Sequence, residues 1–243
     1  MSVKSGVPRL DELLRGGFPD NSNILIYGAP FTGKAEMILQ FILQGLAEGV
    51  PGIIVSTDKT ASDIKADLAR IDPGFQKYDD DGLVHYIDVY SVSIGSEQRI
   101  NNAEYVDSPV NLNAMALAMN KVQDKLKGKY ERHCIAFNSI STLVTYTNPV
   151  TTFRFIQILS GKCKRLGATT LHTLEEGMHE EMEVQMFKHL TDGVIELKEN
   201  EKDLKTYLHV QGMGEVVTRD WVEYKNSSKG VELVGSFSTG RIR

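Results

Sequence analysis

The sequence predicts an α/β fold, with a mostly parallel twisted sheet flanked by helices and antiparallel strands at the C-terminal end. Short apolar runs of strand type alternate with longer segments of helical spacing as far as residue 173. From Asp192 onward, the apolar residues recur with a period close to two, which is typical of antiparallel strands. The 243 residues are expected to form one domain, residues 1–243.

The parallel part of the predicted sheet alternates strand and helix from residue 24 onward. Short apolar runs predict strands over residues 24–27, 52–56, 84–90, 134–137 and 168–173. Apolar residues at helical spacing predict helices over residues 35–48, 61–71, 110–127 and 152–166. Gly49 and Pro51 end the first of these helices, and Thr60 is a candidate N-cap for the second.

The remaining segments are a polar stretch and the C-terminal strands. Residues 91–109 are polar, and we expect them to form a surface loop. The period-two pattern predicts antiparallel strands, joined by turns, over residues 194–197, 205–211 and 221–224.

The composition is that of an ordinary globular protein, with 41% hydrophobic and 24% charged residues. The formal net charge of -5 and the pI near 5.7 argue against a generally basic nucleic-acid binder. The apolar runs are too short to cross a membrane, and residues 1–6 lack the apolar core of a signal peptide. Cys134 and Cys163 form no metal-type or disulfide-type cluster. We therefore expect a cytoplasmic protein without a membrane partner.

A glycine-rich motif follows the first predicted strand, where residues 28–34 read GAPFTGK and fit the pattern G-x-x-x-x-G-K. A strand before the motif and a helix after it are the context in which backbone N–H groups and a helix N-terminus bind phosphate. The predicted nucleotide-binding residues are Gly28, Ala29, Pro30, Phe31, Thr32, Gly33, Lys34 and Ala35. The alternative is a glycine-rich turn that carries a surface lysine.

One residue of this motif departs from the pattern. Ala35 stands where the pattern has Ser or Thr, whose hydroxyl holds Mg²⁺. Lys34 still reaches the outer phosphates. The motif therefore predicts binding of ATP or ADP, and it gives little support for Mg²⁺.

Several segments resemble the RecA/RadA superfamily of P-loop ATPases, and most closely its KaiC-like, single-domain branch of archaeal or bacterial type. They are SGVPRLDELLRGGFP at residues 5–19, GIIVS at 52–56, NSIS at 138–141 and LTDGVIEL at 190–197. The first and last are specific markers, and the resemblance extends over nearly the whole chain. It implies a RecA-like fold, nucleotide binding at the glycine-rich loop, and assembly with further subunits.

The same resemblance shows which catalytic parts are changed. Asn138 stands at the usual Walker B position, where active members have an Asp that holds or orients Mg²⁺, so no metal ligand is assigned. Asp58 and Lys59 stand at the positions of the water-activating glutamates, so Asp58 is the candidate base and no catalytic residue is otherwise assigned. The Lys-x-Arg-Gly segment of active members corresponds to Gln211-Gly212-Met213-Gly214.

These changes together predict a KaiC-like pseudo-ATPase that binds ATP or ADP with weak or absent hydrolysis. It is expected to act as a regulatory or assembly subunit, either as a homo-oligomer or beside a catalytically active paralogue. One alternative is a slow but genuine ATPase that uses Asp58 as its base. The other is a DNA-repair recombinase paralogue, against which the acidic pI and the lack of a basic or aromatic loop argue.

Other polar residues have two interpretations each. Lys59 either replaces part of the missing metal charge near the outer phosphate or is a solvated surface lysine. His172 either senses phosphate or packs in the core. The glutamates at residues 175–183 are interpreted as an acidic loop and helix surface rather than a metal site. Ser139 and Ser141 have no His or Asp partner at a spacing that implies a catalytic triad.

Overall fold

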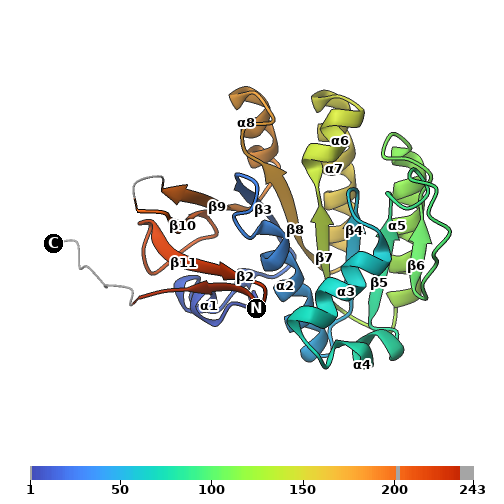
Figure 1. The fold of residues 1–243 in the computed structure, drawn as a ribbon, viewed down its shortest axis with the longest axis horizontal. Helices are drawn as coiled ribbons and strands as arrows, with labels where there is room; N and C mark the ends of the chain where they lie inside the picture. The colour runs from blue at the N-terminus through green and yellow to red at the C-terminus, as the bar shows by residue number, and fades with distance from the viewer. Residues whose placement is uncertain (1, 201–202, 236–243) are drawn as a thin grey trace.

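The computed structural model describes residues 2–200 and 203–235. Within these residues, ten strands form one sheet in the order β12-β11-β10-β9-β3-β8-β7-β4-β5-β6. Figure 1 shows helices on both sides of this sheet, with the C-terminal strands at one end. The structure therefore confirms the predicted α/β, RecA-like architecture.

The part of the sheet from β9 to β6 is parallel, as the alternation of strand and helix predicts. Its strands are β3 (Asn23–Gly28), β4 (Gly52–Ser56), β5 (Val84–Asp88), β6 (Ala103–Tyr105), β7 (His133–Asn138), β8 (Ala168–Glu175) and β9 (Gly193–Asn200). The antiparallel extension consists of β10 (Lys205–Gly212), β11 (Val222–Ser227) and β12 (Gly230–Leu233). A separate two-stranded sheet pairs β1 (Ser2–Val3) with β2 (Phe18–Pro19).

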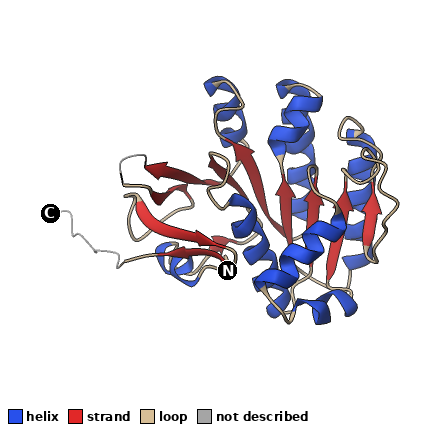
Figure 2. Cartoon of the chain, in the orientation of Figure 1, coloured by secondary structure: helices blue, strands red, loops and turns tan. Residues whose placement is uncertain are grey.

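Two apolar cores lie on the two faces of the sheet. Figure 2 shows the helices that cover these faces in blue and the strands of the sheet in red. The first core packs under α1 (Pro8–Leu13), α2 (Lys34–Ala47), α3 (Ala61–Ile71) and α4 (Phe75–Asp80). The second packs under α5 (Leu112–Leu126), α6 (Ile140–Tyr146), α7 (Pro149–Arg165) and α8 (Glu181–His189). Because side chains alternate along a strand, Ile24 and Ile26 of β3 join the first core, and Leu25 and Tyr27 join the second.

The sequence-based elements differ from the structure at a few places. Thr60 is the N-cap of α3, as predicted, and it forms a capping box with Asp63. The segment 91–109, expected to be a loop throughout, contains the short edge strand β6. The sequence patterns also do not predict several short elements, because each is too short to establish a hydrophobic period of its own: β1, α1, β2, α4, α6 and β12.

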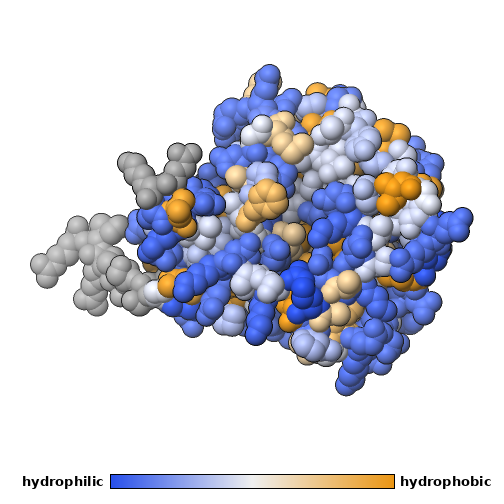
Figure 3. Space-filling model, in the orientation of Figure 1, coloured by the Kyte–Doolittle hydropathy of each residue, from blue (hydrophilic) through white to orange (hydrophobic). Residues whose placement is uncertain are grey.

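Among residues 2–200 and 203–235, none of the helices combines the length and the apolar composition that a membrane-spanning helix needs. On the face seen in Figure 3, hydrophobic residues are scattered among hydrophilic ones.

The carboxyl ends of the parallel strands bring distant segments together at one edge of the sheet. Gly28 at the end of β3 pairs in register with Glu175 at the end of β8. Ser56 at the end of β4 pairs with Asn138 at the end of β7. In open parallel sheets, this edge is where ligands bind.

Candidate functional site

The predicted phosphate loop connects β3 to α2 at this carboxyl edge. Phe31 and Gly33 have positive φ angles of 67° and 92°, and Gly33 is the N-cap of α2. A Cβ atom on Gly28 would lie 2.4 Å from the carbonyl oxygen of Leu197, and one on Gly33 would lie 2.9 Å from Cγ of Asn226. Both glycines of the motif are therefore required by close packing, and Gly33 also by its backbone conformation.

Lys34 points back into the loop. Its Nζ donates hydrogen bonds to the carbonyl oxygens of Gly28 and Ala29, at 2.8 and 2.5 Å. The same atom lies 2.9 Å from Oε2 of Glu175, and only 5% of the lysine side chain is exposed. Burial lowers the pKa of Lys34, and the pairing with Glu175 opposes this effect. Two of the three donors of the ammonium group therefore bond the loop backbone, and its charge is balanced by the ion pair with Glu175.

Asn138 lies between two hydrogen-bonding partners. Its Nδ2 donates to Oδ1 of Asp58 at 2.8 Å, and its Oδ1 accepts from Oγ1 of Thr173 at 2.8 Å. Burial raises the pKa of Asp58, although Lys59 and Asn138 both act to lower it. At this position an amide donates to a carboxylate, so the two side chains are compatible without a cation between them.

Lys59 is committed to the neighbouring helix. Its Nζ lies 2.7 Å from Oδ2 of Asp67 in α3, and the same carboxylate pairs with Arg70 at 3.1 Å. Lys59 is 45% exposed. Its side chain nevertheless borders the cavity described next. Its exposure and its pairing with Asp67 are features of a surface lysine, and its place in the cavity lining is the feature that the alternative, a charge near the outer phosphate, requires.

A cavity of about 180 Å³ joins these residues. Its walls include two lysines and three carboxylates, and the lining residues are Phe31, Gly33, Lys34, Ala35, Glu36, Asp58, Lys59, Asn138 and Glu175. The structure therefore brings together the predicted loop, the candidate base and the Walker B position. Sequence reasoning missed Glu175, which was interpreted as part of an acidic surface. Its position as the last residue of a strand at the carboxyl edge was the available signal.

A hydrogen-bonded chain supports Glu175 from behind. Oγ of Ser141 accepts a hydrogen bond from the backbone N–H of Glu175 at 2.8 Å, and it lies 2.7 Å from Nε2 of His179. Nδ1 of His179 lies 4.0 Å from Oε2 of Glu183. The fold therefore places a Ser, a His and a Glu side by side in space, an arrangement that their spacing in the sequence does not predict. Ser141 is only 1% exposed, so this group is suited to hold the end of β8 rather than to attack a substrate.

The C-terminal hairpin of β11 and β12 packs against the phosphate loop. The hydroxyl of Tyr224 donates to the carbonyl oxygen of Thr32 at 2.5 Å, and Nδ2 of Asn226 donates to that of Phe31 at 3.4 Å. Gln40 of α2 bonds both backbone groups of Val231, at 2.7 and 3.2 Å. The conformation of the loop thus depends on residues almost two hundred positions away along the chain.

Two of the remaining candidate groups lie away from the cavity lining. Nε2 of Gln211 donates a hydrogen bond to Oε2 of Glu196 at 2.8 Å. Gln211 lies near the end of β10, where it pairs with Val194 near the start of β9. His172 is a core residue, packed against Phe137, with Nε2 lying 3.3 Å from Oγ of Ser160. Burial lowers the pKa of His172 to about 4. The structure therefore favours the core interpretation of this histidine.

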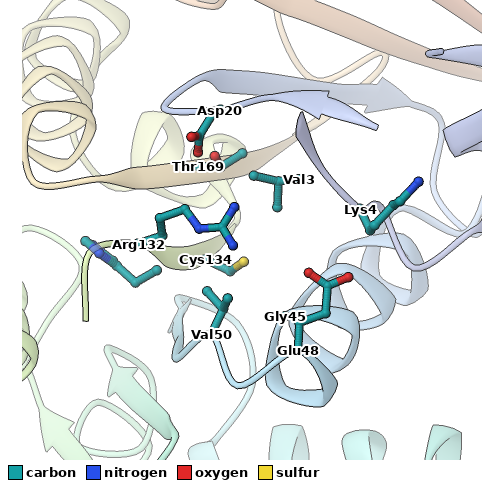
Figure 4. A pocket seen from close by; sticks show the side chains of 10 residues that line it. Val3, Lys4, Asp20, Gly45, Glu48, Val50, Arg132, Cys134 and Thr169 are labelled. Atoms are coloured by element: carbon teal, nitrogen blue, oxygen red, sulfur yellow. The ribbon is translucent and has the colours of Figure 1, made fainter. Parts of the chain in front are cut away.

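A second cavity lies near the opposite edge of the sheet, where strands β7 and β8 begin (Figure 4). The side chains labelled in Figure 4 include Asp20, Glu48 and Arg132, together with Cys134 near the start of β7. It encloses about 10 Å³, which is room for no more than one water molecule. Burial raises the pKa of Cys134 to about 12, so its thiol stays protonated there.

Comparison with known proteins agrees with this geometry. The family model of the KaiC ATPases matches residues 3–235. A UPF0273 protein of Aeropyrum pernix is 26% identical over 202 residues, which cover 83% of this chain and 79% of the relative. A UPF0273 protein of Thermotoga maritima is 28% identical over 207 residues, covering 83% and 81%. A solved KaiC-like protein of Pyrococcus horikoshii superimposes with a TM-score of 0.76 at 23% identity, covering 97% of this chain and 99% of that one.

Proposed function

Because this chain belongs to the KaiC family of ATPases, we propose that it binds ATP or ADP at residues 28–35 and hydrolyses the nucleotide weakly or not at all. It then acts as a regulatory or assembly subunit. The observation that carries this proposal is the hydrogen bond from Asn138 to Asp58 at the place where the family resemblance puts a metal-holding aspartate.

The phosphate-binding features of the site are retained. A glycine-rich loop leads into the N-terminus of the 14-residue helix α2, whose positive end faces the cavity. Lys34 provides a buried positive charge in the same cavity. An anion is the ligand that this combination of backbone N–H groups, helix dipole and ammonium group favours.

The residues present do not fit Mg²⁺ in the way that active relatives would hold it. Ala35 offers no side-chain oxygen, and Oδ1 of Asn138 already accepts a hydrogen bond from Thr173. Within the described part of the chain, no group of three His, Cys, Asp or Glu side chains is arranged to hold a metal ion. Mg²⁺ requires oxygen ligands in near-octahedral geometry, and this site offers few of them. Because Mg²⁺ neutralises the charge that develops during phosphoryl transfer, a weakened Mg²⁺ site is expected to slow hydrolysis.

The proposal is tested by nucleotide-induced stabilisation measured beside phosphate release. We expect ATP and ADP to raise the melting temperature in the presence of EDTA, because binding to the native state stabilises it. Lys34→Ala, checked for folding by circular dichroism, is expected to abolish this shift. Phosphate release in Mg²⁺ is expected to stay at background. No thermal shift with either nucleotide, with or without Mg²⁺, would reject the proposal.

The second candidate function is slow hydrolysis with Asp58 as the base. It is favoured by one observation: Asp58 lines the cavity, and burial raises its pKa towards the range of a general base. Mg²⁺-dependent phosphate release that is lost in both Lys34→Ala and Asp58→Asn would establish this activity.

Association with a partner subunit is proposed on separate grounds. Phe31, on the tip of the phosphate loop, is 99% exposed although it is a large aromatic residue. An aromatic side chain in this position is an anchor of the kind that protein interfaces bury. Sedimentation velocity with and without nucleotide is expected to show self-association that Phe31→Ser weakens. A monomer at all concentrations would leave an active paralogue as the partner to test by co-purification.

A further inference from the structure

Glu175 places a carboxylate beside Lys34 in the cavity that the phosphate loop borders. We infer that Glu175 is a specificity-determining residue, an internal anion that makes the metal-free site favour ADP over ATP. This inference rests on the proposed function, since it concerns the same cavity. Its basis is the ion pair of 2.9 Å between Glu175 and the buried ammonium group.

The ammonium group of Lys34 is surrounded by groups of the protein itself. It donates hydrogen bonds to the carbonyl oxygens of Gly28 and Ala29, which belong to the backbone of the loop. Its ion-pair partner is Glu175, whose Oε2 has no hydrogen-bond partner of its own among the described residues and whose side chain is 24% exposed. A phosphate that binds Lys34 therefore competes with the carboxylate of Glu175 for the ammonium charge.

The displaced carboxylate cannot move far from the phosphates. The backbone N–H of Glu175 is held by Oγ of Ser141 at 2.8 Å. The next N–H, of Glu176, donates to the carbonyl oxygen of Gly28 at 2.9 Å. The end of β8 is thus pinned to the loop, so that rotation of the Glu175 side chain leaves its charge beside the cavity.

The other charges around the cavity do not neutralise this carboxylate. Glu36 and Asp58 add two more acidic groups, and Lys59 is already paired with Asp67. Ala35 has no side-chain oxygen and Asn138 has no charge, so these two positions supply no anionic ligand for a metal that could compensate. The additional phosphoryl group of ATP therefore enters a region of excess negative charge, where like charges repel strongly because the cavity is partly desolvated.

Calorimetric titration of ADP and ATP in EDTA tests the inference, with wild type, Glu175→Gln and Glu176→Gln. Glu175→Gln keeps an oxygen for Lys34 and removes the charge. Wild type is expected to bind ADP more tightly than ATP. Glu175→Gln is expected to tighten ATP binding about tenfold and ADP binding by less, since one unit charge is removed beside the outer phosphate. Glu176 is exposed and lies next in the chain, so its variant removes a charge of the same sign in solvent, and it is expected to change both affinities less than Glu175→Gln does.

The possible outcomes separate this inference from the proposed function. If both nucleotides bind through Lys34 but Glu175→Gln changes their affinities equally or not at all, the inference is overturned and the proposed function stands. If no variant binds either nucleotide, both are overturned. A wild type that prefers ATP in EDTA also overturns the inference. Thermal denaturation of Glu175→Gln, with Glu175→Ala as a second variant, excludes misfolding as the cause of a changed affinity.

Discussion

At the scale of single residues, the site is defined by how Asn138 and Asp58 share hydrogen bonds. A carboxylate at position 138 would face the carboxylate of Asp58 at the distance of the present hydrogen bond, 2.8 Å. Two such groups do not both stay ionised without a cation or a shared proton between them. The amide removes this requirement, because it donates a hydrogen bond to the carboxylate of Asp58.

Asn138→Asp is predicted to destabilise the protein by about 1–3 kcal/mol at neutral pH, because a hydrogen bond becomes a repulsion. The loss is expected to shrink on acidification, since the carboxyl pair has a raised pKa and protonation relieves it. Urea unfolding at several pH values measures the effect. The matched control is the swapped pair, Asp58→Asn with Asn138→Asp, which restores one amide and one carboxylate. Equal destabilisation of both variants would contradict this account.

Buried histidines dominate the expected response to acid. Burial lowers the pKa of His133 and His172 to about 4 each, and it also lowers the pKa values of His85 and His179. A group whose pKa is lower in the native state binds its proton in the unfolded state first. Stability is therefore retained above the unfolded pKa, near 6.5, and is lost as the pH falls from there towards 4.

Unfolding free energies from urea titrations between pH 7 and pH 4.5 are predicted to fall, with each histidine contributing at most about 1.4 kcal/mol per pH unit. His133→Gln is expected to reduce the slope. Asp11 and Asp58 act in the opposite direction, because burial raises their pKa values. If the unfolding free energy of the wild type rises as the pH is lowered from 7 to 4.5, the carboxyl groups dominate instead of the histidines.

At the scale of elements, the β11–β12 hairpin is the part that holds the phosphate loop in place. Tyr224 and Asn226 of β11 bond backbone carbonyl groups of the loop, and Val231 of β12 bonds Gln40 in the helix that follows the loop. A change in the hairpin is therefore transmitted to Lys34 through the loop backbone, without contact between the hairpin and a nucleotide.

Tyr224→Phe is predicted to lower the unfolding free energy by about 1 kcal/mol, because the carbonyl group of Thr32 loses a buried donor. It is also expected to weaken nucleotide binding. Tyr207→Phe is the matched control: its hydroxyl bonds Asp203 at the surface, and its removal is expected to have a smaller effect than that of Tyr224 because water replaces the lost contact. Equal midpoint shifts for the two variants in urea unfolding would argue against a special role for the hairpin.

The elements also show what a sequence can predict. The long helices and buried strands of the parallel part follow from strong hydrophobic periods, and the structure reproduces them within a few residues. The contact of β12 with α2 and the pairing of Glu175 with Lys34 depend on tertiary packing between segments far apart in the chain. Such contacts leave no local period, and for this reason Glu175 was assigned to the acidic surface.

At the scale of the whole molecule, one sheet places the parts of the site. The carboxyl ends of β3, β4, β7 and β8 meet at one edge, and they carry the loop, Asp58, Asn138 and Glu175. The parallel order of the strands explains why residues that are distant in sequence border one cavity. The fold thus keeps the framework of the KaiC family of ATPases, and the strand order brings the charged and polar side chains of its carboxyl edge to one cavity.

Nucleotide binding without Mg²⁺ is the property on which the proposed function depends. It is measured by isothermal titration of ADP into the full chain in EDTA. We expect saturable binding to the wild type that is lost in Lys34→Ala, with an affinity that added Mg²⁺ does not improve. Binding that requires Mg²⁺, or an absence of binding in both conditions, would contradict it.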